Sequence, residues 1–180
     1  GGLTKIGAGT QILTGVNTYT GPTTISAGEL IGNTAGSCAS SPVAVASGAT
    51  NGVQLAAANG QWICGGLTYS AGTTWADFDF TAIAPSTTVA PLNINGNLAV
   101  NSTVNVIARG SALTAGTSYP LITWTGVGPA NLNVFGAVAL PASMPGTLTL
   151  NSVTKTISVT AGIHVPNLSY TNATGTSRQI

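Results

Sequence analysis

The chain has 180 residues, a formal net charge of +1 and only 4% charged residues, whereas soluble domains devote about a quarter of their residues to Asp, Glu, Lys and Arg. Three acids and one histidine offer little material for acid–base catalysis or metal ligation, so we expect no enzyme, no cofactor and no metal site. The small charge also argues against nucleic-acid binding, no apolar run is long enough for a membrane-spanning helix, and a nearly uncharged surface favours association between copies.

Residues 2–30 carry the most specific motif of the chain. They read GLTKIGAGTQILTGVNTYTGPTTISAGEL. Over about thirty residues, this segment closely resembles the passenger-associated repeat of bacterial autotransporters. Residues 43–50 resemble the coil that commonly follows this repeat, and residues 116–122 and 148–159 are similar to the closing part of such modules.

This resemblance implies a right-handed parallel β-helix that is exported to the cell exterior and has no catalytic residues. The glycines of the repeat suit tight corners that need a positive φ. Its threonine and asparagine side chains can satisfy the backbone groups of those corners. The resemblance therefore implies a structural role at the cell surface.

Strand patterns dominate the rest of the chain. Residues 75–83 alternate with period two. One face of this strand would carry Ala76, Phe78, Phe80 and Ala82, and the other would carry Trp75, Asp77, Asp79 and Thr81. Further strands are predicted at residues 92–95, 98–100, 103–107, 120–125 and 154–159. Asn95-Gly96 is a turn signal between two of them, and the best helical candidate, residues 55–59, is only one turn long.

Small-residue turns recur along the chain at a nearly constant spacing. The series is Gly9, Gly28, Gly48, Gly72, Gly96, Gly116, Gly136 and Gly162, in steps of 19, 20, 24, 24, 20, 20 and 26 residues. A period near 20 is typical of a solenoid of stacked β-coils. An antiparallel β-sandwich, which needs turns at shorter spacing, is the alternative. We expect a β-helix-like domain over residues 1–165 and a C-terminal tail or connecting strand over residues 166–180.

Cys38 and Cys64 are the two cysteines of the chain. An even count in a charge-poor chain rich in Thr and Asn suits an oxidising, extracellular setting and one disulfide. This bond would close a loop of about 26 residues and stabilise the fold by about 3 kcal/mol. The alternative is two unlinked thiols.

Asp77 and Asp79 form the closest carboxylate pair. On a strand they would point the same way, about 7 Å apart. An acidic face could belong to an enzyme that cuts polysaccharides. Two carboxylates are too few for a calcium site. We therefore expect Asp77 and Asp79 to be ordinary side chains that face solvent. His164 has no partner motif for a catalytic triad.

Three tryptophans and three glycosylation triplets complete the candidate sites. Trp62, Trp75 and Trp124 would form either a platform for stacking sugars or part of the core. The N-glycosylation pattern occurs at Asn101, Asn167 and Asn172, where chance matches are expected in a chain rich in Asn and Thr.

The polar segment after Pro166 has two alternating apolar anchors, Leu168 and Tyr170. It would either form a strand along a neighbouring copy or be a frayed tail or linker. We therefore expect an extracellular structural protein that self-associates into a surface fibre or sheath, with other copies of itself as partners. The alternative is a monomeric passenger domain that adheres to, binds or cleaves surface glycans.

Overall fold

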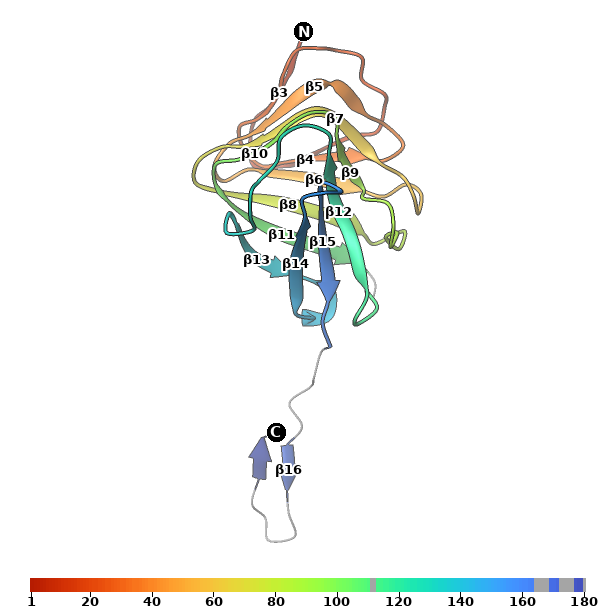
Figure 1. The fold of residues 1–180 in the computed structure, drawn as a ribbon. Coiled ribbons are helices and arrows are strands. Elements are labelled where there is room, and N and C mark those ends of the chain that lie inside the picture. Colours follow the sequence, from red (N-terminus) through yellow and green to blue (C-terminus); the bar gives the residue numbers. More distant parts are fainter. Residues whose placement is uncertain (111–112, 164–168, 172–176, 180) are drawn as a thin grey trace.

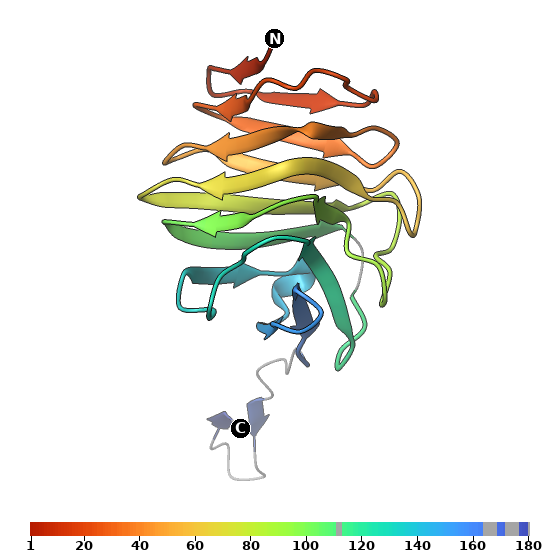
Figure 2. The same ribbon diagram turned by 45° about the horizontal axis from the view of Figure 1, so that its top comes forward.

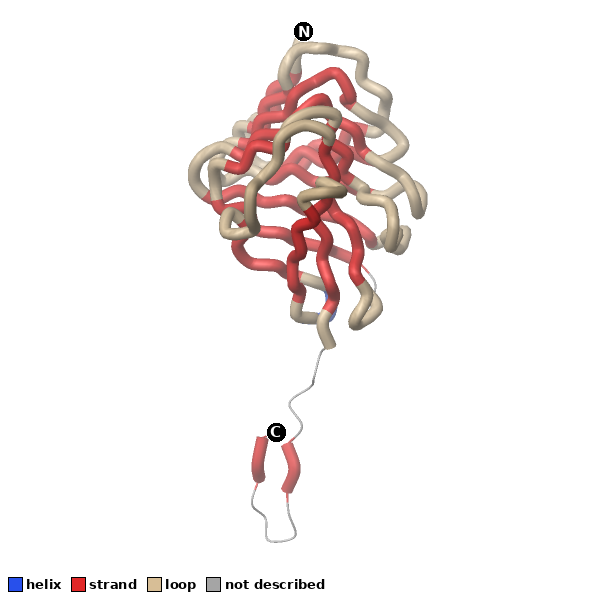
Figure 3. Tube along the Cα trace, in the orientation of Figure 1, coloured by secondary structure: helices blue, strands red, loops and turns tan. Residues whose placement is uncertain are grey.

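The chain folds into stacked β-coils. A computed structural model describes residues 1–110, 113–163, 169–171 and 177–179. In this part of the chain there is no α-helix, and the strands are accompanied by one 3-10 turn, η1 (Pro141–Ser143). Figures 1 and 2 show coils that follow one another from the red N-terminal end towards the blue C-terminal end. The tube in Figure 3 shows that loops join the strands at the corners of each coil.

Two sheets are built from alternate strands of the chain. Sheet A contains, in spatial order, β1 (Leu3–Lys5), β3 (Thr23–Ile25), β5 (Cys38–Val45), β7 (Trp62–Tyr69), β9 (Leu92–Ile94), β12 (Ser118–Trp124), β15 (Thr156–Ala161) and β14 (Gly146–Asn151), with β10 (Leu98–Val100) pairing with β7. Sheet B contains β2 (Thr10–Leu13), β4 (Glu29–Asn33), β6 (Thr50–Gln54), β8 (Thr73–Phe80), β11 (Thr103–Gly110) and β13 (Phe135–Ala139).

The pairing within the coils is parallel. From β1 to β12 in sheet A, and throughout sheet B, hydrogen-bonded neighbours run in the same direction. Parallel neighbours need a crossover connection, which here is the strand in the opposite sheet. The fold is therefore the predicted parallel β-helix, or solenoid, and not the alternative antiparallel β-sandwich.

The two ends of the solenoid are built differently. At the C-terminal end, β15 pairs antiparallel with both β12 and β14 and ends the coiling of sheet A. At the N-terminal end, the parallel strands β1 and β2 are the edges of their sheets. A separate antiparallel pair, β16 (Ser169–Thr171) and β17 (Ser177–Gln179), lies in the last part of the chain.

The interior is filled by side chains that repeat from coil to coil. Ile25, Val45 and Tyr69 are register partners in sheet A, and each has an exposed fraction of 0%. In β8, Phe78 and Phe80 point inward as the alternation predicted, and their ring centroids are 6.3 Å apart. Like positions stack directly over one another because parallel strands keep the same face inward.

Three glycines turn the chain from sheet A to sheet B. Gly28, Gly48 and Gly72 have φ values of 67°, 81° and 111°, in the region that disfavours side chains. A Cβ at Gly28 would lie 2.5 Å from the carbonyl oxygens of Gly7 and Gly9, so the first corners pack backbone on backbone. The corner glycines of the predicted series are thus confirmed for the early coils.

Only one later member of the glycine series stands at a corner between the sheets. Gly116 has a φ of 78° and lies in the turn before β12, whereas Gly96 lies between β9 and β10, Gly136 is within β13, and Gly162 follows β15. The corner before β11 contains Asn101 and Ser102 instead. In the later coils the glycines keep their regular spacing in the sequence, but the loops differ in length, so the same spacing no longer marks the same corner.

Two local predictions are corrected by the structure. Asn95-Gly96 does not reverse the chain, because β9 and β10 both run parallel to β7. Residues 55–59 form bends and a turn, not a helical turn. In both places the stacking of coils overrides a short local preference.

Candidate functional site

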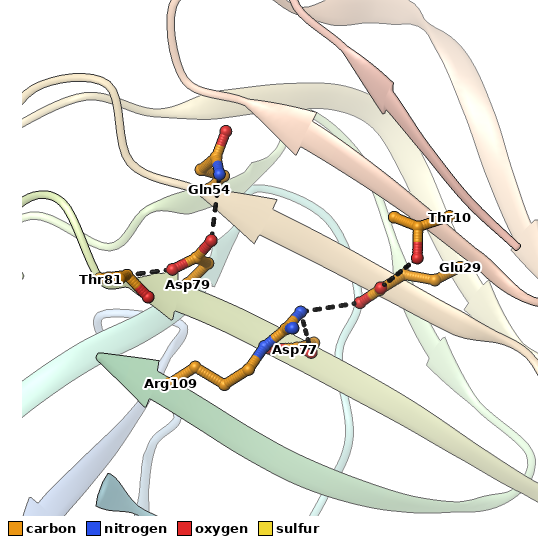
Figure 4. Close-up of polar contacts among 7 residues, drawn as sticks. All are labelled: Thr10, Glu29, Gln54, Asp77, Asp79, Thr81 and Arg109. Atoms are coloured by element: carbon orange, nitrogen blue, oxygen red, sulfur yellow. Dashed lines mark hydrogen bonds and ion pairs between the residues drawn. The ribbon is translucent and has the colours of Figure 1, made fainter.

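All three acidic side chains of the chain and one of its four basic side chains, Arg109, gather on one surface. Asp77 and Asp79 point to the outer face of sheet B, opposite the inward Phe78 and Phe80. Glu29 from β4 and Arg109 from β11 reach the same surface, as Figure 4 shows. This outer face is therefore the candidate site with the most chemistry in the described part of the chain.

The carboxylate–arginine cluster consists of Glu29, Asp77 and Arg109. Arg109 Nη2 lies 2.5 Å from Asp77 Oδ2 and 3.2 Å from Glu29 Oε1, and Arg109 Nε donates to Asp77 Oδ1 at 3.0 Å. Thr10 Oγ1 donates to Glu29 Oε2 at 3.0 Å. One guanidinium thus compensates two carboxylates, and the contacts join β2, β4, β8 and β11.

Gly52 leaves the space in which the cluster forms. Gly52 on β6 is paired with Ile31 on β4 and with Asp77 on β8. A Cβ at this position would lie 3.0 Å from Ile31 Cγ1 and 3.3 Å from Glu29 Oε1. Glu29 can reach across β6 because no side chain stands in its way.

Asp77 is buried within this cluster. Its exposed fraction is 6%, so the prediction that it faces solvent is wrong. Burial raises the pKa of Asp77 to about 6, and the charge and hydrogen bonds of Arg109 counteract this rise. The physical reason for the burial is the covering of the outer face by the long side chains of Glu29 and Arg109, which the alternation in β8 does not reveal.

A second polar row, the amide ladder, consists of Asn33, Gln54 and Asp79. Asn33 Nδ2 donates to Gln54 Oε1 at 3.0 Å, and Gln54 Nε2 donates to Asp79 Oδ2 at 3.0 Å. The Thr81 backbone N–H donates to Asp79 Oδ1 at 2.9 Å. Partial burial opposes ionisation, but the hydrogen bonds from Thr81 and Gln54 hold the pKa of Asp79 below its ordinary value. Both carboxylates of the predicted pair are therefore engaged in contacts that join the coils.

Cys38 and Cys64 are register partners on β5 and β7. Both are buried, with exposed fractions of 1%, and both thiols are free in the structure. Burial raises the pKa of Cys38 to about 12 and that of Cys64 still further. Adjacent strands are about 4.8 Å apart, which falls within the Cα separation of about 4.4–6.8 Å found in disulfides. The predicted bond stays a prediction, between residues that the fold places side by side.

The three tryptophans do not share one surface. Trp62 and Trp124 are buried, with exposed fractions of 3% and 5%, and Trp75 is half-buried on the outer face of sheet B. A Cβ at Gly32 would lie 2.1 Å from the Trp62 ring, so the indole packs against bare backbone. The prediction that these residues belong to the core is confirmed for Trp62 and Trp124. The three tryptophans do not form a joint platform for stacking sugars.

The N-terminal opening is the exposed end of the solenoid at β1 and β2. A cavity of about 330 Å³ lies there, lined by Leu3, Thr4, Lys5, Ile6, Gln11, Leu13 and Leu30. Ile6 and Ile12 are large hydrophobic residues with exposed fractions of 73% and 40%. Val16 in the following loop is 71% exposed. This end of the molecule combines apolar side chains with unpaired strand edges.

The remaining predicted residues lie mostly at the end of the chain. Leu168, His164, Asn167 and Asn172 fall outside the described residues. Tyr170 belongs to β16, where its register partner is Arg178. Asn101 is exposed at a corner, and its backbone N–H donates to the Tyr69 carbonyl at 2.9 Å.

Metal sites and membrane-spanning helices are two further classes of candidate site. Within residues 1–110 and 113–163, and the two short terminal strands, no group of three or more His, Cys, Asp or Glu residues is placed to hold a metal ion. The same described ranges contain no helix with the length and hydropathy needed to cross a membrane.

Comparison with known proteins bears on the first two coils. Residues 3–31 match the family described as passenger-associated-transport-repeat, which confirms the resemblance found in the sequence. The match covers β1, β2 and β3 and the first half of β4. No curated protein and no solved structure matches the chain. The repeat indicates an exported surface protein of the autotransporter-passenger type.

Proposed function

We propose that this chain is a structural module of an extracellular surface assembly and that its copies associate through the N-terminal opening. The observation that supports this proposal is the unpaired edge at that end. In the described part of the chain, β1 pairs only with β3, and β2 pairs only with β4. A free edge presents backbone N–H and C=O groups that can pair with a strand from another chain.

The surface around this edge lacks the usual protection against strand pairing. Natural edges are commonly blunted by charged residues, especially Lys. Lys5 lies in β1, but its ammonium donates to the carbonyl oxygens of Ile6, Gly7 and Ala27 at 2.9, 2.7 and 3.1 Å. Its charge is thereby held against the corner of its own coil. Ile6 and Ile12 remain exposed beside the edge, so pairing there would also bury apolar area.

The opposite edge of sheet A offers a different surface. In β14 the exposed side chains are polar, namely Thr147, Thr149 and Asn151. The antiparallel strands β15 and β14 end the stacking of coils in sheet A, and β13 is the last strand of sheet B. The contrast favours association through β1 and β2 over association through β14.

Sedimentation of the purified protein over a range of concentrations tests this proposal. We expect the mass to exceed that of one chain and to rise with concentration. Ile12→Lys places a charge at the edge and should return the protein to monomers. Val153→Lys is the matched control, because Val153 is 90% exposed in the loop between β14 and β15. A wild-type protein that stays monomeric at all concentrations would contradict the proposal.

The tail is the competing route of association predicted from the sequence. A truncated chain without residues 166–180 lacks Leu168 and Tyr170 but keeps the N-terminal opening. Under our proposal this truncated chain still associates. If truncation abolishes association and Ile12→Lys does not, copies join through the tail instead.

We also propose that the chain has no catalytic activity and that glycan binding is a secondary candidate. Asp77 and Asp79 contact Arg109, Gln54 and Thr81, which supports a role in joining coils. Trp75 is the tryptophan that a glycan could reach on the outer face of sheet B. Glycan cleavage that is lost in Asp77→Asn or Asp79→Asn would overturn the structural proposal.

A further inference from the structure

We propose that Asn95 is a site of covalent self-modification, where the chain converts asparagine to aspartate and isoaspartate through a succinimide. The site is the joint between β9 and β10, where Asn95 is followed by Gly96. Water is the reactant and a carboxylate is the product. No Asp or Glu lies near Asn95 in the sequence. The inference is independent of the proposed function.

The reaction uses only groups of the backbone and the asparagine side chain. The backbone nitrogen of Gly96 attacks Asn95 Cγ and forms a C–N bond. The side-chain nitrogen leaves as ammonia and takes the proton that the Gly96 N–H loses. Water then adds to one of the two carbonyl carbons of the five-membered ring, which opens to aspartate or isoaspartate. Glycine favours this attack because no Cβ hinders the approach of its nitrogen.

The groups that must react are free at this joint. Asn95 is exposed. Among the described residues, neither its side chain nor the Gly96 N–H has a hydrogen-bond partner. The neighbouring Asn97 differs, because its Oδ1 accepts a hydrogen bond of 2.8 Å from the Val127 backbone N–H. A side chain that is not held by such a bond can turn towards the following nitrogen.

Two other Asn-Gly pairs in the same chain serve as internal comparisons. Asn51 is buried, with an exposed fraction of 5%, and Gly52 lies within β6 between two paired strands. Asn59 is exposed, but the Gly60 N–H donates to the Ala57 carbonyl at 2.9 Å. The structure therefore ranks Asn95 as the most reactive of the three.

The isoaspartate product would disturb the local stacking. It carries the main chain through its Cβ and inserts one methylene between two anchored groups. These anchors are the bond from Asn95 N–H to the Cys64 carbonyl, 2.7 Å, and the bond from Gly126 N–H to the Gly96 carbonyl, 2.8 Å. A Cβ at Gly96 would lie 2.2 Å from the Gly65 carbonyl oxygen, so there is little room for a longer chain. One conversion changes the formal net charge from +1 to zero.

The test is to age the folded protein at mildly alkaline pH and to follow all three asparagines by tandem mass spectrometry of chymotryptic peptides. Isoaspartate is detected separately by labelling with protein isoaspartyl methyltransferase. We expect Asn95 to convert first and Asn95→Gln to remove the early methyl acceptor. Asn95→Asp supplies the charge without the longer backbone, and it should unfold at a higher denaturant concentration than the isoaspartate form.

The unfolded chain provides the decisive comparison. In denaturant the three Asn-Gly pairs lose their different surroundings, so their conversion rates should become similar. The inference is overturned if, in the folded protein, Asn95 stays intact while Asn59 or Asn51 converts. It is equally overturned if the three sites convert at equal rates with or without denaturant.

Discussion

Arg109 on β11 contacts Glu29 on β4, 80 positions earlier in the chain, across the intervening strands β6 and β8. The contact depends on Gly52, which leaves a gap in the outer face of β6. It also depends on Asp77, which binds the same Arg109 nitrogen. A chain with few charges thus uses three of them together to join β4, β8 and β11 across β6.

Removal of the shared cation should weaken the solenoid. In Arg109→Ala, Glu29 and Asp77 lose their common partner and repel each other. We expect a loss of about 1–2 kcal/mol in the free energy of unfolding, because a charged hydrogen bond contributes about 1.5–3 kcal/mol and solvent screens part of it around the 48% exposed Arg109 side chain. Denaturant unfolding measures this loss.

A double-mutant cycle isolates the contribution of the pair. Arg109→Ala should cost less in an Asp77→Asn background, because the neutral amide does not leave an unpaired charge. Equal costs in the two backgrounds would show that Arg109 acts through packing alone.

The stability of the protein should rise as pH is lowered from neutral to about 5. The pKa of Asp77 is about 6 in the folded protein, above the ordinary value of 3.8. Between these values the folded state holds a proton that the unfolded state releases. The corresponding stability is fully present below the unfolded pKa and is lost as pH rises through about 6. The charged groups around Asp77 are Arg109 on β11, Glu29 on β4 and Asp79 on its own strand, and β6 contributes none.

Unfolding midpoints at several pH values test this dependence. An unperturbed histidine titrates at about pH 6.5, so the comparison is made in a His164→Asn background. Asp77→Asn should remove most of the rise in stability. Asp79→Asn should keep it, because the pKa of Asp79 is lowered and its contribution is lost only at more acidic pH. If the unfolding midpoint of the wild-type protein decreases as pH is lowered from neutral to 5, the role of Asp77 is contradicted.

The sequence predicts the solenoid well and the charged cluster poorly. The period-two pattern of β8 and the corner glycines Gly28 and Gly48 are local features that report directly on coils. Asp77 was expected to face solvent because its partner Arg109 lies 32 positions away. Only the register of β8 with β11 brings the two together. Asn95-Gly96 misled for a related reason, since a turn signal cannot show that the next strand continues in the same direction.

Gly32 should tolerate no side chain. A Cβ at this position would lie 2.1–2.4 Å from three atoms of the Trp62 ring, and Trp62 is almost fully buried. We expect Gly32→Ala to destabilise the fold by about 1–3 kcal/mol, the usual cost of overpacking. Gly15→Ala is the control, because a Cβ there meets no atom within 4 Å. Equal unfolding midpoints for the two variants would contradict the packing of Trp62 against the β4 backbone.

The cysteine pair should be oxidised in protein from an oxidising compartment. Cys38 and Cys64 are register partners on adjacent strands, so the fold can hold a bond between them. Burial raises the pKa of both thiols and makes them slow to react in the folded chain, so we expect the bond to form before folding is complete. Thiol titration of the unfolded, non-reduced protein should then find no reactive thiol. Reduction should lower the free energy of unfolding by about 3 kcal/mol. Two titratable thiols per chain in the non-reduced protein would refute the bond.

Hydrogen exchange at low and high protein concentration reports which strands join the copies. We expect amide protection in β1 and β2 to rise with concentration, since these edges gain a partner strand. Protection in β14 should stay unchanged over the same range. Protection that rises in β14 and not in β1 and β2, in samples whose mass shows association, would contradict assembly through the N-terminal opening.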